Sequence, residues 1–494
     1  MSERFEEDDD EKKESTKKTK TSKRKRRGER GCYHCGSTSH RGKDCPSVVC
    51  RHCGQSGHDV GGCPTKPQPP VNLGQFAATA AATTSFSSTT PFTFIELFAG
   101  IGGFRVALEK LDGKCVFASE IDTFCRKNYS LNFMGDIPAG DITRIESKHI
   151  PSHNLLVGGF PCQPFSTSGK QEGLKDETRG MLYREIVRIL KDKQPEAFVL
   201  ENVRGLVLHD EGKTFKIIRQ EFENECGYKV YWEVLDAVTI LPQERRRLFI
   251  VGIRNDIAQG KGKGQYKFPK LPNLQRRVQD ILQGVTTEDP LTGDEFYKLK
   301  LSTHQIDKVK RQNYTQQHFE SRFLSDLSKP SKTLQASYTN YMVGSQFVAT
   351  TTTTVATSAV PDNDNNDDDA GDADAGGSGG WRRFSPREAA RLMGFPESFT
   401  LCNQRSYHML GNAVAPPLIA SIVAPLLSLI GVIGIPTTKN DDGNNYNDAK
   451  KVVDGWEVTC EMLLDAVPQD SRKEELQKKL EEETTKRSMS LQVP

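Results

Sequence analysis

Cys162 is a candidate nucleophile because of the short stretch of sequence around it. It follows an apolar run at residues 154–157, which predicts a buried strand, and it lies between Pro161 and Pro164. Open α/β sheets keep their reactive groups in the loops at the carboxyl ends of strands. A thiol reacts as its thiolate, and free backbone N–H groups with nearby cations lower the pKa of a thiol. The stretch alone leaves a buried structural cysteine open as the alternative.

An acid and two arginines further along the chain could serve the same reaction. Glu201 ends a second apolar run, at residues 197–200, which again predicts a strand. Arg245 and Arg247 begin another strand and alternate with Arg246, so they share a face that Arg246 does not. Taken alone, a helix cap or a surface acid explains Glu201, and surface charge explains the arginines.

The sequence before the cysteine predicts a pocket for a nucleoside. A strand at 93–98 leads into a glycine loop at 100–103 and an amphipathic helix, so a ligand can approach the backbone and the helix N-terminus. A strand at 114–119 ends in Glu120, where such folds hold ribose hydroxyls. The loop lacks the G-x-G-x-x-G form of a dinucleotide site. A nucleoside cofactor without a pyrophosphate, such as S-adenosylmethionine (AdoMet), therefore fits better.

A repeated cysteine and histidine pattern predicts two structural zinc ions. Both units read C-x2-C-x4-H-x4-C, and the second is displaced from the first by 18 residues. Three thiolates and one imidazole complete a tetrahedral zinc site. The units resemble retroviral-type zinc knuckles, which implies binding of single-stranded nucleic acid or RNA. The proposed ligands are Cys32, Cys35, His40, Cys45, Cys50, Cys53, His58 and Cys63.

The ordered motifs together resemble those of the cytosine carbon-5 methyltransferases. The resemblance covers residues 94–257 and 381–427. The motifs are Phe98-Ala99-Gly100, Glu120, Asp141, Pro161-Cys162, Glu201-Asn202-Val203, Gln243 to Arg247, Pro386 to Pro396 and Gly411 to Val414. It implies an α/β fold, with a Rossmann-like AdoMet-dependent methyltransferase domain and a small target-recognition domain. It also implies that the activity is DNA cytosine-5 methylation.

The chemistry of that reaction gives each candidate a role. A Cys162 thiolate that adds to carbon 6 of cytosine makes carbon 5 a nucleophile. Glu201 would protonate or hydrogen-bond nitrogen 3, Arg247 would bind oxygen 2, and Arg245 would support the loop. Sulfur and methyl donor need both faces of the ring, so the base must be flipped out of a DNA duplex or already unpaired. Residues 163–180 would close over it.

The resemblance also indicates which residues bind the cofactor. Asn412 is expected to order the cysteine loop beside the cofactor, with a buried structural asparagine as the alternative. The proposed cofactor-binding residues are Phe98, Gly100, Gly102, Gly103, Glu120, Ile121, Asp141, Ile142 and Asn412.

Two further functions stay open at this point. One branch of the family methylates tRNA, and zinc knuckles favour single strands. That branch has Pro-Pro-Cys-Gln-Pro-Phe-Thr around its cysteine, whereas this chain has Phe160 and Ser166 of the DNA-modifying form. A non-catalytic nucleic-acid binder is the other alternative, and the retained Cys162 and Glu201 argue against it.

Composition divides the 494 residues into eight segments. The first three are a disordered charged arm at 1–30, the two knuckles at 31–64 and a flexible linker at 65–91. The catalytic AdoMet-binding domain follows at 92–258, and the target-recognition region at 259–348. The last three are a disordered acidic insertion at 349–380, the closing methyltransferase motifs at 381–432, and an accessory tail at 433–494 with a helical pattern at 474–486.

The charge pattern bears on location and partners. The net charge is +2, but residues 12–30 hold eleven Lys or Arg and two Glu, which suits anionic partners. The basic run at 23–27 could be a nuclear import signal, a phosphate-contacting arm or a solvated tail, and we expect a nuclear protein. No apolar stretch looks long enough to span a bilayer, so we expect no membrane partner.

Overall fold

The computed structural model describes part of the chain. The described residues are 92–161, 182–260, 265–284, 291, 293–311, 323–340, 345–350, 380–402, 405–432, 456–468 and 470–490. The predicted arm, both knuckles with their eight ligands, the linker, Cys162 and the predicted closing loop lie outside these residues. So do most of the acidic insertion and residues 433–455.

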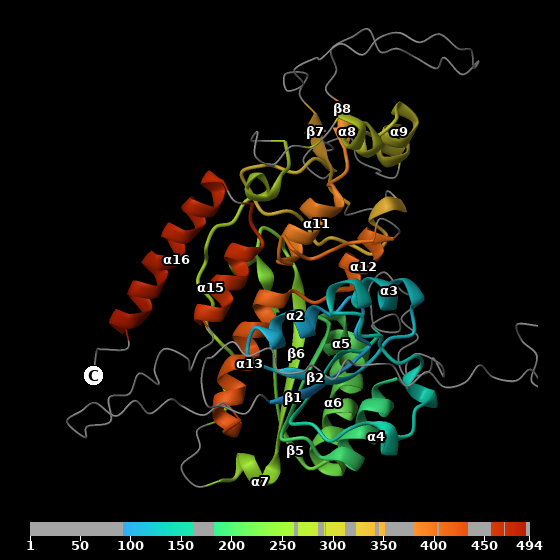
Figure 1. Ribbon diagram of the computed structural model, residues 1–494, viewed down its shortest axis with the longest axis vertical. Helices are drawn as coiled ribbons and strands as arrows, with labels where there is room; N and C mark the ends of the chain where they lie inside the picture. The colour runs from blue at the N-terminus through green and yellow to red at the C-terminus, as the bar shows by residue number, and fades with distance from the viewer. Residues whose placement is uncertain are drawn as a thin grey trace, which may run out of the picture. The chain divides into compact units, whose positions relative to one another are not determined.

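A six-stranded sheet in the order β2-β1-β3-β4-β6-β5 positions the site (Figure 1). Four strands run parallel: β1 (Thr93–Leu97), β2 (Lys114–Ser119), β3 (Leu155–Gly159) and β4 (Ala197–Val203). β6 (Arg246–Arg254) is antiparallel to both β4 and β5 (Tyr228–Asp236). The strands expected at 93–98, 114–119, 154–157 and 197–200 are all present, and the predicted α/β fold is confirmed.

Helices cover both faces of the sheet because successive strand residues point to opposite sides. Phe94, Val157 and Val199 contribute to one core, with α2 (Gly103–Glu109), α3 (Thr123–Asn132) and α13 (Pro416–Ile430). Ile95, Leu156 and Phe198 contribute to the other, with α4 (Tyr183–Lys193), α5 (Gly205–Leu208) and α6 (Lys213–Gln220). The strands are therefore mostly apolar on both sides, as a sheet buried on both faces requires.

α13 corrects the expectation that no apolar stretch could span a bilayer. The segment Ser406–Ile430, which joins α12 (Ser406–Asn412) to α13, is long and apolar enough by length and composition. However, 83% of its apolar window is buried, as in a helix that packs inside a protein core. α13 begins with Pro416 and Pro417, which suit a first helical turn, and ends at Gly431, where φ is 77°.

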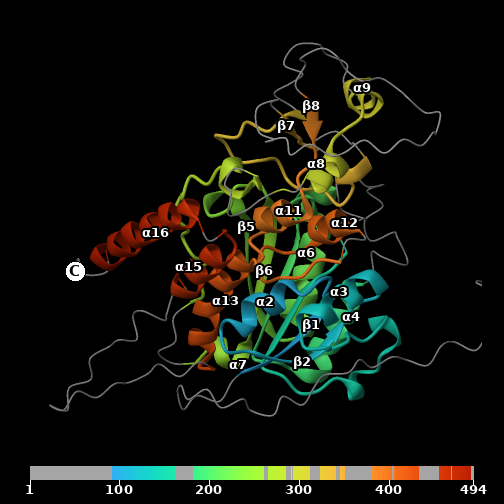
Figure 2. The ribbon, with the colours of Figure 1, turned by 45° about the horizontal axis from the view of Figure 1, so that its top comes forward.

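The target-recognition region and the two ends of the predicted insertion form a small group of elements on one side of α11 (Pro386–Met393) (Figures 1 and 2). They are α8 (Gly293–Leu299), α9 (Thr303–Arg311) and the antiparallel pair of β7 (Val348–Thr350) and β8 (Gly380–Arg382). β7 and β8 take in both ends of the segment expected to be an insertion. Residues 351–379, outside the described part, connect two paired strands.

The C-terminal tail is more than the accessory segment that we expected. Its helical pattern is present as α16 (Ser471–Ser490), and α15 (Trp456–Asp465) packs against α13. Leu463 and Leu480 are buried in the core on that side of the sheet. The Arg472 guanidinium donates to the carbonyl of Leu282, so the tail also contacts the target-recognition region. α7 (Asn255–Ala258) completes the described α-helices.

Candidate active site

The strand register brings the predicted site residues to one edge of the sheet. Leu97 pairs with both Ser119 and Gly158, so the carboxyl ends of β1, β2 and β3 are level. Gly159 pairs with Glu201 at the end of β4, and Val203 pairs with Arg247 at the start of antiparallel β6. The nucleoside loop, the Pro-Cys loop, the acid and the arginines therefore meet at this edge.

A cavity of about 300 Å³ opens at this edge. The wall includes all the described residues that we proposed for catalysis or cofactor binding except Gly102 and Gly103. The members are Phe98, Gly100, Glu120, Ile121, Asp141, Ile142, Glu201, Arg245, Arg247 and Asn412. Segments more than 300 residues apart in the sequence thus form one pocket.

Gly102 and Gly103 do not line the cavity, and their proposed contact with the cofactor stays a prediction. Gly102 has a φ of 88°, and a Cβ there would come within 2.3 Å of the Phe133 ring. A Cβ on Gly103 would come within 2.8 Å of the Val414 side chain. These glycines let the chain turn and let α2 pack closely on its neighbours, so they determine the conformation of the loop from its buried side.

Glu120 defines the end of the cavity suited to a nucleoside. Its Oε2 accepts a hydrogen bond from the Gly100 N–H at 2.8 Å, and its Oε1 accepts one from the Asp122 N–H at 2.7 Å. A carboxylate accepts about four hydrogen bonds, so it retains capacity for ribose hydroxyls. Burial raises the pKa of the Glu120 carboxyl, while the two N–H groups oppose this rise.

Two neighbouring features suit a purine ring. Ile121 is 70% exposed and presents an apolar side chain to the cavity. Across from β2, the Asp141 Oδ1 accepts from the backbone N–H of Thr143, which leaves Oδ2 for a ligand. Ser119 fixes this loop because its hydroxyl donates to the carbonyl of Gly140 at 2.8 Å. The acceptor oxygens of Glu120 and Asp141 and the apolar surface of Ile121 fit AdoMet.

Glu201 and Arg247 form an ion pair at the other end of the cavity. Arg247 Nε lies 3.0 Å from Glu201 Oε1, and the two side chains are 16% and 11% exposed. Oε2 has no hydrogen-bond partner among the described residues. It faces Gly159, where a Cβ would lie 3.4 Å away. Burial raises the pKa of the Glu201 carboxyl, while Arg247 and then Arg245 oppose this rise.

Arg245, which we expected to support the loop rather than to bind the base, makes the contacts of a positioning residue. Its guanidinium is buried and donates to the carbonyls of Gly411 at 3.1 Å, Ala413 at 2.6 Å and Leu334 at 3.4 Å. Arg245 therefore connects the closing motifs to the residues that precede β6, and it serves the site by holding these segments in place. Arg246 points away, as expected, and pairs at the surface with Asp236.

Asn202, not Asn412, holds the described part of the Pro-Cys loop. Asn202 is buried, and its Nδ2 donates to the carbonyl of Phe160 at 3.1 Å. Asn412 is exposed in the cavity wall, which excludes the buried structural asparagine. No hydrogen bond joins Asn412 to residues 158–161 of the loop in the described structure. Its proposed contact with the cofactor stays a prediction.

A comparison with protein families identifies the family to which this chain belongs. The family model described as C-5 cytosine-specific DNA methylase matches residues 92–428. The chain belongs to this family. A zinc-knuckle model also matches residues 30–47, the first of the two repeated units.

Two relatives of this C-5 cytosine-specific DNA methylase are bacterial Type II methyltransferases. It is 34% identical over 390 residues to Type II methyltransferase M.DsaV of Dactylococcopsis salina, covering 78% of this chain and 97% of the relative. It is 38% identical over 346 residues to Type II methyltransferase M1.ScrFI of Lactococcus lactis subsp. cremoris, covering 69% and 79%. Among solved structures, the Entamoeba histolytica methyltransferase EhMeth aligns with a TM-score of 0.50 at 19% identity, covering 69% of this chain and 98% of that one. The last likeness shows the fold alone.

Sequence reasoning missed several cavity residues of this methyltransferase. Asp122 and Cys125 line it from the start of α3, and His408 and Met409 line it from α12. His408 lies one helical turn before Asn412, so the 3.6-residue period could have indicated it. Asp122 lies two residues after Glu120, in the same loop.

Proposed function

We propose that this DNA cytosine-5 methyltransferase acts through a covalent adduct between Cys162 and a cytosine flipped out of a DNA duplex. The observation that carries the proposal is the Glu201–Arg247 pair, with Glu201 Oε2 open to the cavity that also holds Glu120. An acid and a nucleoside site in one cavity suit methyl transfer to a base.

The proposed reaction begins when the Cys162 thiolate forms a bond to carbon 6. The electron pair of the 5,6 double bond moves through the ring toward nitrogen 3, which takes a proton from Glu201. Carbon 5 then takes the methyl group, whose former sulfur partner would keep the bonding electron pair and leave as a neutral thioether. A water molecule removes the carbon 5 proton, the bond between sulfur and carbon 6 breaks to return the thiolate, and the proton on nitrogen 3 returns to Glu201. Cys162 lies outside the described residues, so its role rests on the sequence motif.

Burial of Glu201 suits the role of proton donor. A carboxyl group with a raised pKa keeps its proton nearer to neutral pH, where a surface carboxyl has lost it. Arg247 holds Oε1 and leaves Oε2 for nitrogen 3. The same guanidinium lies beside the position proposed for oxygen 2 and stabilises negative charge that develops there.

AdoMet, when bound, supplies the methyl group as an electrophile attached to a sulfonium sulfur. Glu120 would hold the ribose hydroxyls, Ile121 would pack on the adenine, and Asp141 would accept from the adenine edge. The contacts of Glu120 with Gly100 and Asp122 support this arrangement because they orient its carboxylate before the ligand arrives.

Transfer of labelled methyl groups tests the substrate and the nucleophile. The full chain is incubated with labelled AdoMet and duplex DNA, single-stranded DNA or tRNA. We expect methylation of duplex DNA, and methylation confined to tRNA would refute the DNA substrate. Cys162→Ser should abolish transfer and keep AdoMet binding, whereas Arg246→Ala, the matched surface variant, should leave both unchanged.

We also propose that the two knuckles bind one zinc ion each and contact nucleic acid, single-stranded DNA or RNA included. The exact repeat of the ligand spacing and the family match at residues 30–47 support this. Cys35→Ser should lower the zinc content from two ions to one and weaken nucleic-acid binding more than turnover at saturating DNA. Equal loss of binding and turnover, with the fold intact, would place the knuckles in the active site instead.

The basic run at 23–27 supports a nuclear location as a further proposal. A fluorescent fusion of the full chain should accumulate in nuclei, and replacement of the five basic residues by alanine should release it. Unchanged nuclear accumulation of the variant would show that this run is not the import signal.

A further inference from the structure

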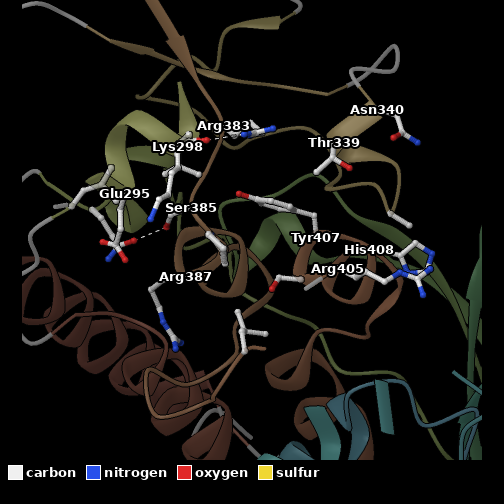
Figure 3. A pocket seen from close by; sticks show the side chains of 17 residues that line it. Glu295, Lys298, Thr339, Asn340, Arg383, Ser385, Arg387, Arg405, Tyr407 and His408 are labelled. Atoms are coloured by element: carbon white, nitrogen blue, oxygen red, sulfur yellow. Dashed lines mark hydrogen bonds between the residues drawn. The ribbon is translucent and has the colours of Figure 1, made fainter. Parts of the chain in front are cut away.

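A second and larger cavity adjoins the candidate active site. It measures about 840 Å³ and lies among α8, α11 and α12, with charged and polar side chains on its walls (Figure 3). The cationic members are Lys298, Arg383, Arg387 and Arg405. Cationic walls of this size suit the backbone of a nucleic acid.

His408 lines both cavities, and it is the one described residue that does so. It lies on α12, between Arg405 at the helix start and Asn412 at the helix end. Figure 3 shows its ring beside Arg405, at the end of the larger cavity away from Glu295 and Lys298. A nucleotide that passes from the larger cavity to the reaction cavity therefore passes His408.

The surroundings of the imidazole favour its neutral form, and one of its nitrogens lacks a hydrogen bond among the described residues. Its Nδ1 is buried without a hydrogen-bond partner among the described residues. Burial lowers the pKa of His408, Arg405 lowers it further, and Asp122 opposes the change. Arg405 is itself held by Asp122 at 3.2 Å and lies over the Phe124 ring. The cationic role at this end thus falls to Arg405, and the imidazole offers a neutral donor and acceptor.

We propose that His408 contacts the target nucleotide between the two cavities and stabilises it outside the duplex. This inference rests on the proposed action on a flipped base. The imidazole hydrogen-bonds the sugar–phosphate backbone of the extrahelical nucleotide, while Arg405 neutralises the adjacent charge. His408 is thereby a substrate-contacting residue that the sequence motifs do not identify.

The test compares two duplexes that differ in the cost of flipping. In one the target cytosine pairs with guanine, and in the other it faces adenine, so that it leaves the stack more easily. His408→Phe keeps a ring of similar size and removes both nitrogens. We expect kcat at saturating DNA to fall about tenfold on the paired duplex, the worth of one hydrogen bond, because the bound base is still mostly stacked there and gains the contact only on flipping. On the mispaired duplex the bound base already makes the contact, so kcat should fall less than about threefold. His408→Gln, which keeps a donor and an acceptor, should restore part of the loss.

The matched control is Lys298→Ala, since Lys298 lines the larger cavity alone. This variant should bind both duplexes more weakly, and by the same factor. AdoMet affinity of both variants should equal that of the unmodified enzyme. Equal losses on the two duplexes for His408→Phe, or no loss, would overturn the inference. An unmodified enzyme that methylates neither duplex would instead refute the proposed function.

Discussion

Three consecutive arginines should respond differently to the same substitution. Arg245 is 2% exposed, Arg246 has a side chain that is 63% exposed, and Arg247 pairs with Glu201 in the cavity. We expect Arg245→Ala to destabilise the protein, Arg246→Ala to do little, and Arg247→Ala to impair methyl transfer more than stability.

The contacts of Arg245 set the magnitude. Its removal leaves the carbonyls of Gly411 and Ala413 without a charged donor, in a region where the Cβ of any residue at 411 would meet the Ala336 backbone at 2.3 Å. Each lost charged hydrogen bond costs about 1.5–3 kcal/mol, so the loss of these two should lower the free energy of unfolding by about 3–6 kcal/mol. Arg246→Ala removes an exposed ion pair and should cost less than about 1 kcal/mol.

Urea unfolding of the three variants, followed by circular dichroism, measures these differences. Arg245→Lys keeps the charge without the planar fork and should fall between the alanine variant and the unmodified protein. Equal midpoints for Arg245→Ala and Arg246→Ala would refute the reasoning, because buried and exposed guanidinium groups would then contribute alike.

Three further outcomes follow from the described contacts. Glu96 is fully buried, and burial raises the pKa of its carboxyl from 4.5 to about 8, so the free energy of unfolding should fall as pH rises from 4.5 to 8. Glu96→Gln should remove this fall and gain up to about 5 kcal/mol above pH 8; parallel pH profiles of the two proteins would contradict the prediction. Glu201→Gln should lower kcat by about 10²–10⁴-fold and leave AdoMet affinity unchanged. In the unmodified enzyme kcat should decline at alkaline pH, where Glu201 loses its proton, and this decline should vanish in the variant; a decline of the same size in both enzymes would exclude Glu201 as the proton donor. Deletion of residues 456–494 should expose the α13 face that packs on α15 and lower the melting temperature sharply, and an unchanged melting temperature would show that the tail is dispensable for stability. The control Lys110→Ala removes only the exposed ion pairs with Glu461 and Asp465 and should cost less than about 1 kcal/mol.

Local sequence signals predicted the elements that carry the site. Apolar runs indicated β1 to β4, and residues that follow such runs reached the same edge because parallel strands end there. The alternation of Arg245, Arg246 and Arg247 along a strand correctly separated the exposed arginine from the other two. In each case the signal lies within a few residues of the position that it predicts.

Contacts between distant segments could not be predicted from the sequence. Arg245 donates to Gly411 across 166 residues of chain, and no local pattern specifies that partner. The same holds for Asn202, whose contact with Phe160 depends on how β3 and β4 pair. The apolar character of α13 resembled neither a strand nor an exposed helix, because helices and the sheet cover it on several sides.

Covalent trapping tests the central claim most directly. The full chain is incubated with AdoMet and a duplex in which 5-fluorocytosine replaces the target cytosine, since fluorine at carbon 5 blocks the final elimination. Mass spectrometry of the digested complex should find the methylated base attached to the peptide that contains Cys162. Methylation of ordinary duplex DNA with no trapped adduct, or an adduct on another residue, would contradict the account.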